Sequence, residues 1–81
     1  MLIDALKILS VVKKPNGFDV EIELDAEDGA SFSGNVFFDS NWEYDFGFLG
    51  VFVNTDSDKD FVFKVFSSDD FKNDVRAFVR S

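Results

Sequence analysis

The side chains that could do chemistry in this chain of 81 residues are mostly carboxylates. Sixteen aspartates and glutamates stand against eight lysines and arginines, and cysteine and histidine are absent. Disulfides, zinc fingers, thiol chemistry and imidazole chemistry are therefore excluded. The remaining general acids and bases would be carboxylates, lysines and Tyr44. A carboxylate pair could hydrolyse glycosides, but so small a chain has little material for a sugar cleft, so we expect no enzymatic activity and no cofactor.

One group of acids has the spacing of a metal-binding loop. Asp56, Asp58 and Asp60 follow the D-x-D-x-D pattern that opens a calcium loop of the EF-hand type. That loop also needs glycine at its sixth position and glutamate at its twelfth, where this chain has Phe61 and Ser67. We therefore expect no metal site, and interpret this polar segment as a hairpin loop rich in turn-forming aspartate.

The clearest pattern is a row of acids that alternates with apolar residues over residues 18–25. In a strand, this period of two places the apolar side chains on one face and the acids on the other, about 6.6–6.8 Å apart. Glu27 and Asp28 extend the row into the next turn. Glu43 and Asp45 join the same face if their strand lies beside the row with the same alternation. The predicted partner-binding residues are Asp19, Glu21, Glu23, Asp25, Glu27, Asp28, Glu43 and Asp45.

The distribution of charge indicates what such a face would bind. The net charge is −8, and residues 15–58 hold eleven acids and no lysine or arginine. This block would repel phosphates, so we expect no direct binding of nucleic acid. It would attract a basic protein surface, such as that of a nucleic-acid-binding protein or a toxin, in the manner of DNA mimics and immunity proteins. The alternative is a solvated sheet face that only keeps the protein in solution.

Turn signals divide the chain into its expected elements. Pro15-Asn16-Gly17, Glu27-Asp28-Gly29 and the weaker Asp39-Ser40-Asn41 are typical of tight turns. The expected strands are residues 5–14, 17–26, 30–39, 42–48, 50–54 and 60–66. A helix over residues 2–9 is an alternative to the first strand. The predicted fold class is α+β, with an antiparallel meander of five to six strands and one C-terminal helix packed on one face, in a single domain over residues 1–81.

Near the C-terminus, the spacing of the apolar residues changes from every second residue to about every 3.6 residues. We therefore expect a helix over residues 68–80. Its apolar residues Phe71, Val75, Phe78 and Val79 share one face, and Ser67 or Ser68 is a suitable cap. A basic stripe lies beside that face and consists of Lys72, Arg76 and Arg80. The stripe either complements the helix dipole or meets the acidic face of a second copy in a homodimer.

Two further functions stay open. The chain could be a self-associating accessory protein that contacts partners through aromatic residues out of phase with the core, namely Phe37, Phe52 and Phe66. It could also bind a small ligand in a phenylalanine-lined pocket between helix and sheet. The sequence shows no signal peptide and no apolar stretch that could span a membrane, so we expect a cytoplasmic protein with no membrane partner.

Overall fold

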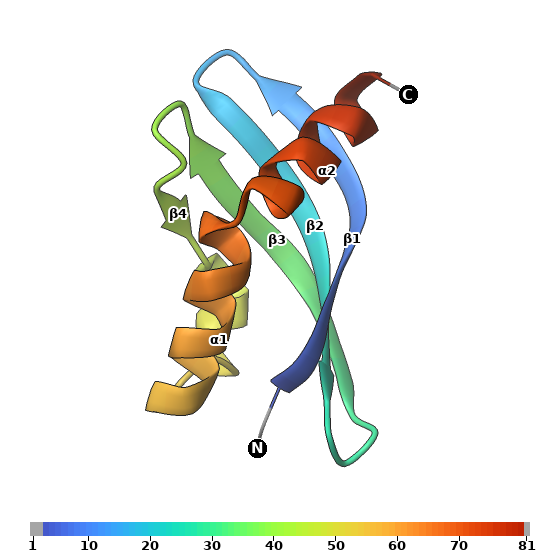
Figure 1. The fold of residues 1–81 in the computed structure, drawn as a ribbon, viewed down its shortest axis with the longest axis vertical. Coiled ribbons are helices and arrows are strands. Elements are labelled where there is room, and N and C mark those ends of the chain that lie inside the picture. The colour runs from blue at the N-terminus through green and yellow to red at the C-terminus, as the bar shows by residue number, and fades with distance from the viewer. Residues whose placement is uncertain (1–2, 81) are drawn as a thin grey trace.

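Figure 1 shows the architecture in a computed structural model, which describes residues 3–80 apart from the side chains of Phe48 and Arg80. An antiparallel sheet of four strands is followed by two helices, so the fold is α+β. The strands are β1 (Ile3–Lys14), β2 (Gly17–Ala26), β3 (Ser31–Asp39) and β4 (Tyr44–Asp45), and their order in the sheet is their order in the chain. A 3-10 helix, η1 (Gly47–Val51), leads to α1 (Asp56–Ser67) and α2 (Asp69–Arg80). The expectation of five to six strands and a single helix is therefore wrong.

The central strand β2 follows the predicted alternation. Along β2, Val20, Ile22 and Leu24 are buried, whereas the residues between them are only half-buried. β1 pairs with one side of β2 and β3 with the other. The helix considered for residues 2–9 is wrong for the described part of that segment, which belongs to β1, and Leu2 lies outside the described residues.

Local turn chemistry closes the first two hairpins. Only Pro15 and Asn16 link β1 to β2, and proline is favoured at the first central position of such a turn. In the turn between β2 and β3, Gly29 has a φ of 91°, which is costly for residues with a Cβ. The carboxylate of Asp28 accepts a hydrogen bond of 3.0 Å from the amide of Ala30. Both turns lie where the sequence predicts them.

The third turn places Trp42 in an unusual backbone conformation. Its φ is 64°, in the left-handed region that bulky residues rarely occupy. The carboxylate of Asp39 holds the turn by accepting hydrogen bonds from the amides of Asn41 and Glu43, at 2.9 and 3.0 Å. The Trp42 ring stacks on Phe18, with 5.5 Å between the ring centroids. This ring contact offsets a conformation that costs about 1–2 kcal/mol.

Beyond this turn the structure differs from the sequence-based expectation. The predicted strand 42–48 is reduced to the two residues of β4, and residues 50–54 contain the end of η1 instead of a strand. Leu49 of η1 is fully buried against Gly34 of β3. A Cβ at position 34 would lie 2.9 Å from Cγ of Leu49. The absence of a side chain on Gly34 therefore lets η1 pack against the sheet.

The predicted strand 60–66 is part of helix α1. The hydroxyl of Thr55 caps this helix by accepting a hydrogen bond of 3.1 Å from the amide of Asp58. The polar segment interpreted as a hairpin loop is thus the start of a helix. Val62 and Phe66 are buried against the sheet, while Phe63 is 56% exposed, so the burial pattern is helical.

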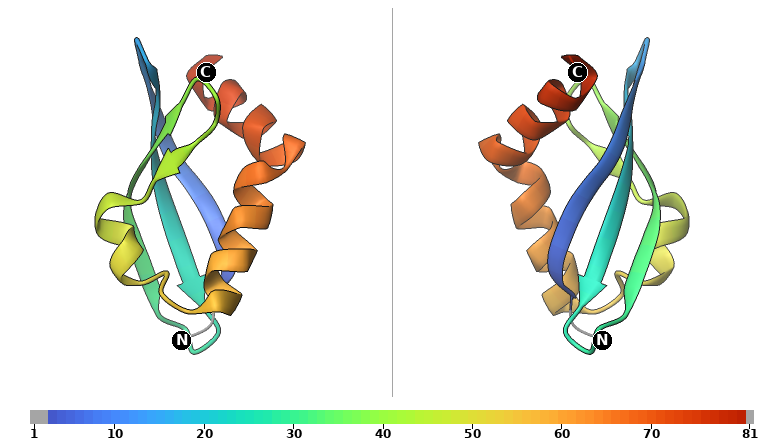
Figure 2. Two further views of the ribbon diagram at one scale, coloured as in Figure 1. Left: turned by 90° about the vertical axis from the view of Figure 1, so that its left-hand side faces the viewer. Right: turned by 90° about the vertical axis from the view of Figure 1, so that its right-hand side faces the viewer.

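Helix α2 lies where the sequence predicts it. The hydroxyl of Ser68 accepts a hydrogen bond of 3.2 Å from the amide of Phe71, which is the geometry of an N-cap. Phe71 and Val75 are buried. Figure 2 shows α1 and α2 together on one side of the sheet. The opposite side, called the outer face below, is covered by neither helix.

A cluster of aromatic rings joins the two layers around Phe38 of β3. Phe38 is fully buried. Its ring contacts those of Trp42, Tyr44, Phe66 and Phe71, with centroid separations between 4.9 and 6.0 Å. The four partners come from the third turn, β4, α1 and α2. The ring of Phe38 therefore contacts the third turn, β4 and both α-helices.

Candidate functional site

The acidic row, defined as Asp19, Glu21, Glu23 and Asp25, lies on the outer face of the central strand β2. Buried residues alternate with these acids along the strand. Because consecutive side chains of a strand point to opposite faces, the apolar residues that fill the core also fix the direction of the carboxylates. The predicted row is therefore present on one uncovered face.

Neutral donors from both flanking strands hold three of the four carboxylates. The hydroxyl of Ser10 on β1 donates to Glu21 at 3.2 Å. On β3, the hydroxyl of Ser31 donates to Asp25 at 2.8 Å, and the amide of Asn35 donates to Asp19 at 3.4 Å. These donors are neutral, so they add no positive charge beside the carboxylates.

One cation also faces the acidic row. The ammonium group of Lys7 on β1 lies 3.9 Å from Glu23 and 3.5 Å from Asp25. The side chain of Lys7 is 63% exposed, and ion pairs this accessible to water contribute little to stability. Lys7 therefore offsets part of the charge at one end of the row, while Asp19 and Glu21 face neutral partners.

The four other predicted acids stand in different positions. Asp45 lies opposite Phe37, which in turn lies opposite Asp19, and opposed residues of an antiparallel sheet share a face. Asp45 is thus on the outer face, two strands away from the row. Glu43 precedes β4 and is exposed in the third turn. The remaining two acids, Glu27 and Asp28, lie beyond the end of the row in the β2–β3 turn.

The sequence did not reveal which polar side chains of the neighbouring strands contact the acidic row. Ser10, Asn35 and Lys7 approach it from strands whose register is set by long-range pairing. A local signal did exist on β3, because the polar residues Ser31, Ser33 and Asn35 alternate. Phe32 and Val36 alternate with them and pack toward the core, so these polar residues face outward beside the acids.

The basic stripe of α2 is directed at Trp42. The ammonium of Lys72 lies 5.8 Å from the centroid of the Trp42 ring, and the guanidinium carbon of Arg76 lies 5.4 Å from it. These distances are those of cation–π contacts. The side chain of Arg80 lies outside the described part of the chain. Two members of the stripe thus have a partner within their own chain.

The aromatic residues considered for contacts have different exposures from those expected. Phe66 is buried, with 1% of its surface exposed, so its prediction as a contact residue is wrong. Phe52 is half-buried and stacks on Phe32 at 4.2 Å. Phe37 is half-buried on the outer face. The phenylalanine that is most exposed among those described is Phe63.

An open depression lies beside Phe63. Its volume is about 660 Å³, and it is lined by Tyr44, Phe46, Gly50, Val53, Lys59, Asp60 and Phe63. Burial raises the pKa of the Tyr44 hydroxyl above its ordinary value, because removal from water disfavours the charged phenolate. The lining thus combines aromatic and aliphatic residues with one hydroxyl and two opposite charges, those of Lys59 and Asp60.

No family model matches the chain, and comparison with curated proteins and with solved structures gives no match. Within residues 3–80, no helix is long and apolar enough to pass through a bilayer. The same part of the chain has no group of three or more acids arranged to hold a metal ion.

Proposed function

We propose that this chain is a non-enzymatic binding module whose outer sheet face engages a basic surface on another protein. The observation that carries the proposal is the acidic row, a line of four carboxylates on a face that neither helix covers. Like charges placed side by side lower stability unless something compensates them. Here the compensation comes mainly from neutral donors, which keep the row negative.

The geometry of the row suits a partner that itself binds polyanions. Alternate residues of a strand are about 6.6–6.8 Å apart, and the phosphates of one nucleic acid strand follow each other at about 3.4 Å along the axis. The row therefore presents about one charge for every second phosphate position. By this analogy of charge, the partner is a nucleic-acid-binding protein or a basic toxin. Complementary charge would mainly accelerate association, and the effect would weaken as salt is added.

Charge reversal within the row tests this proposal. We expect the double variant Glu21→Lys with Glu23→Lys to bind a fluorescent oligolysine peptide at least about tenfold more weakly at low ionic strength. The matched control is Asp60→Lys with Asp69→Lys, which changes the net charge equally but on the helices. We expect this control to lose much less affinity. Fluorescence anisotropy gives the affinities, and circular dichroism verifies the fold of each variant.

Equal losses in the two double variants would mean that only net charge matters, and the acidic row would then serve solubility alone. If the lysine pair in β2 does not fold, the pair Glu21→Gln with Glu23→Gln removes the charge at nearly constant volume. Its control is Asp60→Asn with Asp69→Asn. Partner capture from a lysate of the native host, with the same variants, would then identify the natural ligand.

A second candidate function is contact through exposed aromatic residues, with a partner, a second copy or a small apolar ligand. It is favoured by the exposed ring of Phe63 at the border of the open depression. Under this alternative, Phe63→Ser would abolish self-association, and the association of the parent protein would persist at high salt. Light scattering coupled to size exclusion, at low and high salt, measures both effects. A monomer under all conditions would contradict self-association.

A further inference from the structure

We propose that a groove between β1 and α2 binds an extended peptide segment in which an apolar and a basic side chain alternate with neutral ones. The segment would add a fifth strand to the sheet, beside β1. This site is separate from the acidic row, since it lies at an edge of the sheet and on the side of the helices. The proposal does not depend on the function proposed above.

The edge of β1 is available for strand addition. β1 is the first strand of the sheet and pairs only with β2 within residues 3–80. Its register is interrupted between Ile3 and Ala5 and again between Ile8 and Ser10, and such bulges hinder pairing between edges. Between them, residues 5–8 form an uninterrupted stretch. A peptide could pair there through its backbone, as in β-augmentation.

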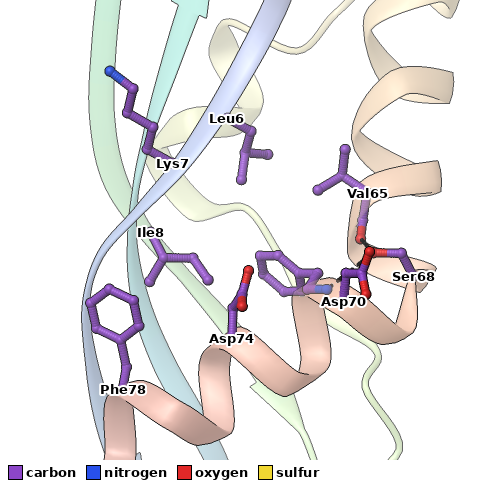
Figure 3. A pocket seen from close by; sticks show the side chains of 9 residues that line it. Leu6, Lys7, Ile8, Val65, Ser68, Asp70, Asp74 and Phe78 are labelled. Carbon is purple, nitrogen blue, oxygen red and sulfur yellow. Dashed lines mark hydrogen bonds between the residues drawn. The ribbon is translucent and has the colours of Figure 1, made fainter. Parts of the chain in front are cut away.

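The groove lies beside this regular stretch. Its volume is about 380 Å³, and it is lined by Leu6, Lys7, Ile8, Val65, Ser68, Asp70, Phe71, Asp74 and Phe78. Figure 3 shows Leu6 directed toward the helices and Asp74 projecting from α2 beside Ile8. The side chain of Lys7 is directed away from α2, toward its ion pairs with the acidic row. The groove thus combines apolar walls with the carboxylates of Asp70 and Asp74.

The charge of the groove selects the occupant. Within the part of the chain that the structure describes, neither Asp70 nor Asp74 forms an ion pair or accepts a side-chain hydrogen bond. The bases Lys72 and Arg76 of the same helix face Trp42 instead. An arginine or lysine of the peptide can lay its aliphatic stem on Leu6 and keep its charged group at the carboxylates.

The pairing geometry also predicts the spacing of the peptide residues. In an added strand, every second side chain points to the face of the helices. A basic residue beside Asp74 therefore has its neighbours on the outer face, near Lys7, where neutral residues avoid repulsion. The next residue on the helix side meets Ile8 or Phe78 and should be apolar. The recognised pattern is apolar, neutral, basic, in either direction.

The test uses a capped peptide, Thr-Val-Thr-Arg-Thr-Val-Thr, titrated into the isotopically labelled protein. We expect NMR shift changes at the amides of residues 5–8 and 70–78, and none along the acidic row. Replacing the arginine of the peptide by glutamate should abolish binding. Asp74→Asn should weaken binding by at least about tenfold, because it removes a charged hydrogen-bond acceptor. The control Asp69→Asn makes the same change on the same helix outside the groove and should have no effect.

The proposal is overturned if the amides of β1 do not respond, if the glutamate peptide binds equally well, or if Asp74→Asn and Asp69→Asn behave alike. Shifts of the β1 amides that depend on protein concentration without peptide would also overturn it, and would identify the edge as an interface between copies. The double variant Glu21→Lys with Glu23→Lys should retain peptide binding. Failure of this site and failure of the acidic row are therefore distinguishable.

Discussion

Replacing Phe38 by alanine is expected to lower the free energy of unfolding by about 3–5 kcal/mol. Phe38 is fully buried, and its ring contacts four other aromatic rings. Its loss would remove apolar burial and leave a cavity where the third turn, β4 and both helices meet. A domain of this size has a total stability of roughly 4–12 kcal/mol. The variant should therefore lose a large part of the stability of the domain.

The neighbouring residue provides the control. Phe37 has the same side chain but is half-buried on the outer face, opposite Asp19 and Asp45. We expect Phe37→Ala to cost only about 1 kcal/mol. Urea denaturation followed by circular dichroism measures both variants, and an unchanged dependence on urea shows that the unfolding transition remains comparable. Equal losses at the two positions would contradict the placement of Phe38 at the centre of the core.

A second large effect is expected at Asp58, which is 1% exposed in the first turn of α1. Its Oδ1 accepts a hydrogen bond of 2.9 Å from the amide of Ile3, and so joins the start of β1 to the start of α1. Its Oδ2 is buried without a hydrogen-bond partner among the described residues. Asp58→Ala leaves the buried amide of Ile3 unsatisfied, and should lower the free energy of unfolding by about 2–3 kcal/mol.

The matched variant at this position is Asp58→Asn. It keeps an oxygen for the amide of Ile3 and removes a charge that is costly to bury. We expect its free energy of unfolding to lie within about 1 kcal/mol of the parent protein, as measured by the same urea titration. An asparagine variant as unstable as the alanine variant would contradict the assignment of the lost stability to the hydrogen bond with Ile3.

The sequence by itself determined the elements whose signals are local. The alternation in residues 18–25 and the turn residues on both sides of it predict β2 and its hairpins. The acidic row follows from the same alternation, because the core requires Val20, Ile22 and Leu24 to face inward. Helix α2 is predicted by the 3.6-residue spacing of Phe71 and Val75 and by a serine cap.

The segment from 42 to 67 was decided by tertiary packing. Its β-branched and aromatic residues favour strands, and residue type alone therefore predicted the wrong element for residues 60–66. The capping pattern of Thr55 and Asp58 was the local sign of a helix. Burial of Val62 and Phe66 against the sheet outweighs the intrinsic preference for strands.

The details of the candidate sites also depend on contacts between distant residues. Lys7 reaches Glu23 and Asp25 only through the register of β1 on β2. The groove at Asp74 exists because α2 packs beside β1. Periodicity along a chain specifies which face of an element is apolar, since that depends on neighbours in sequence. Which elements share that face depends on how their apolar surfaces fit together, and only the folded structure determines that fit.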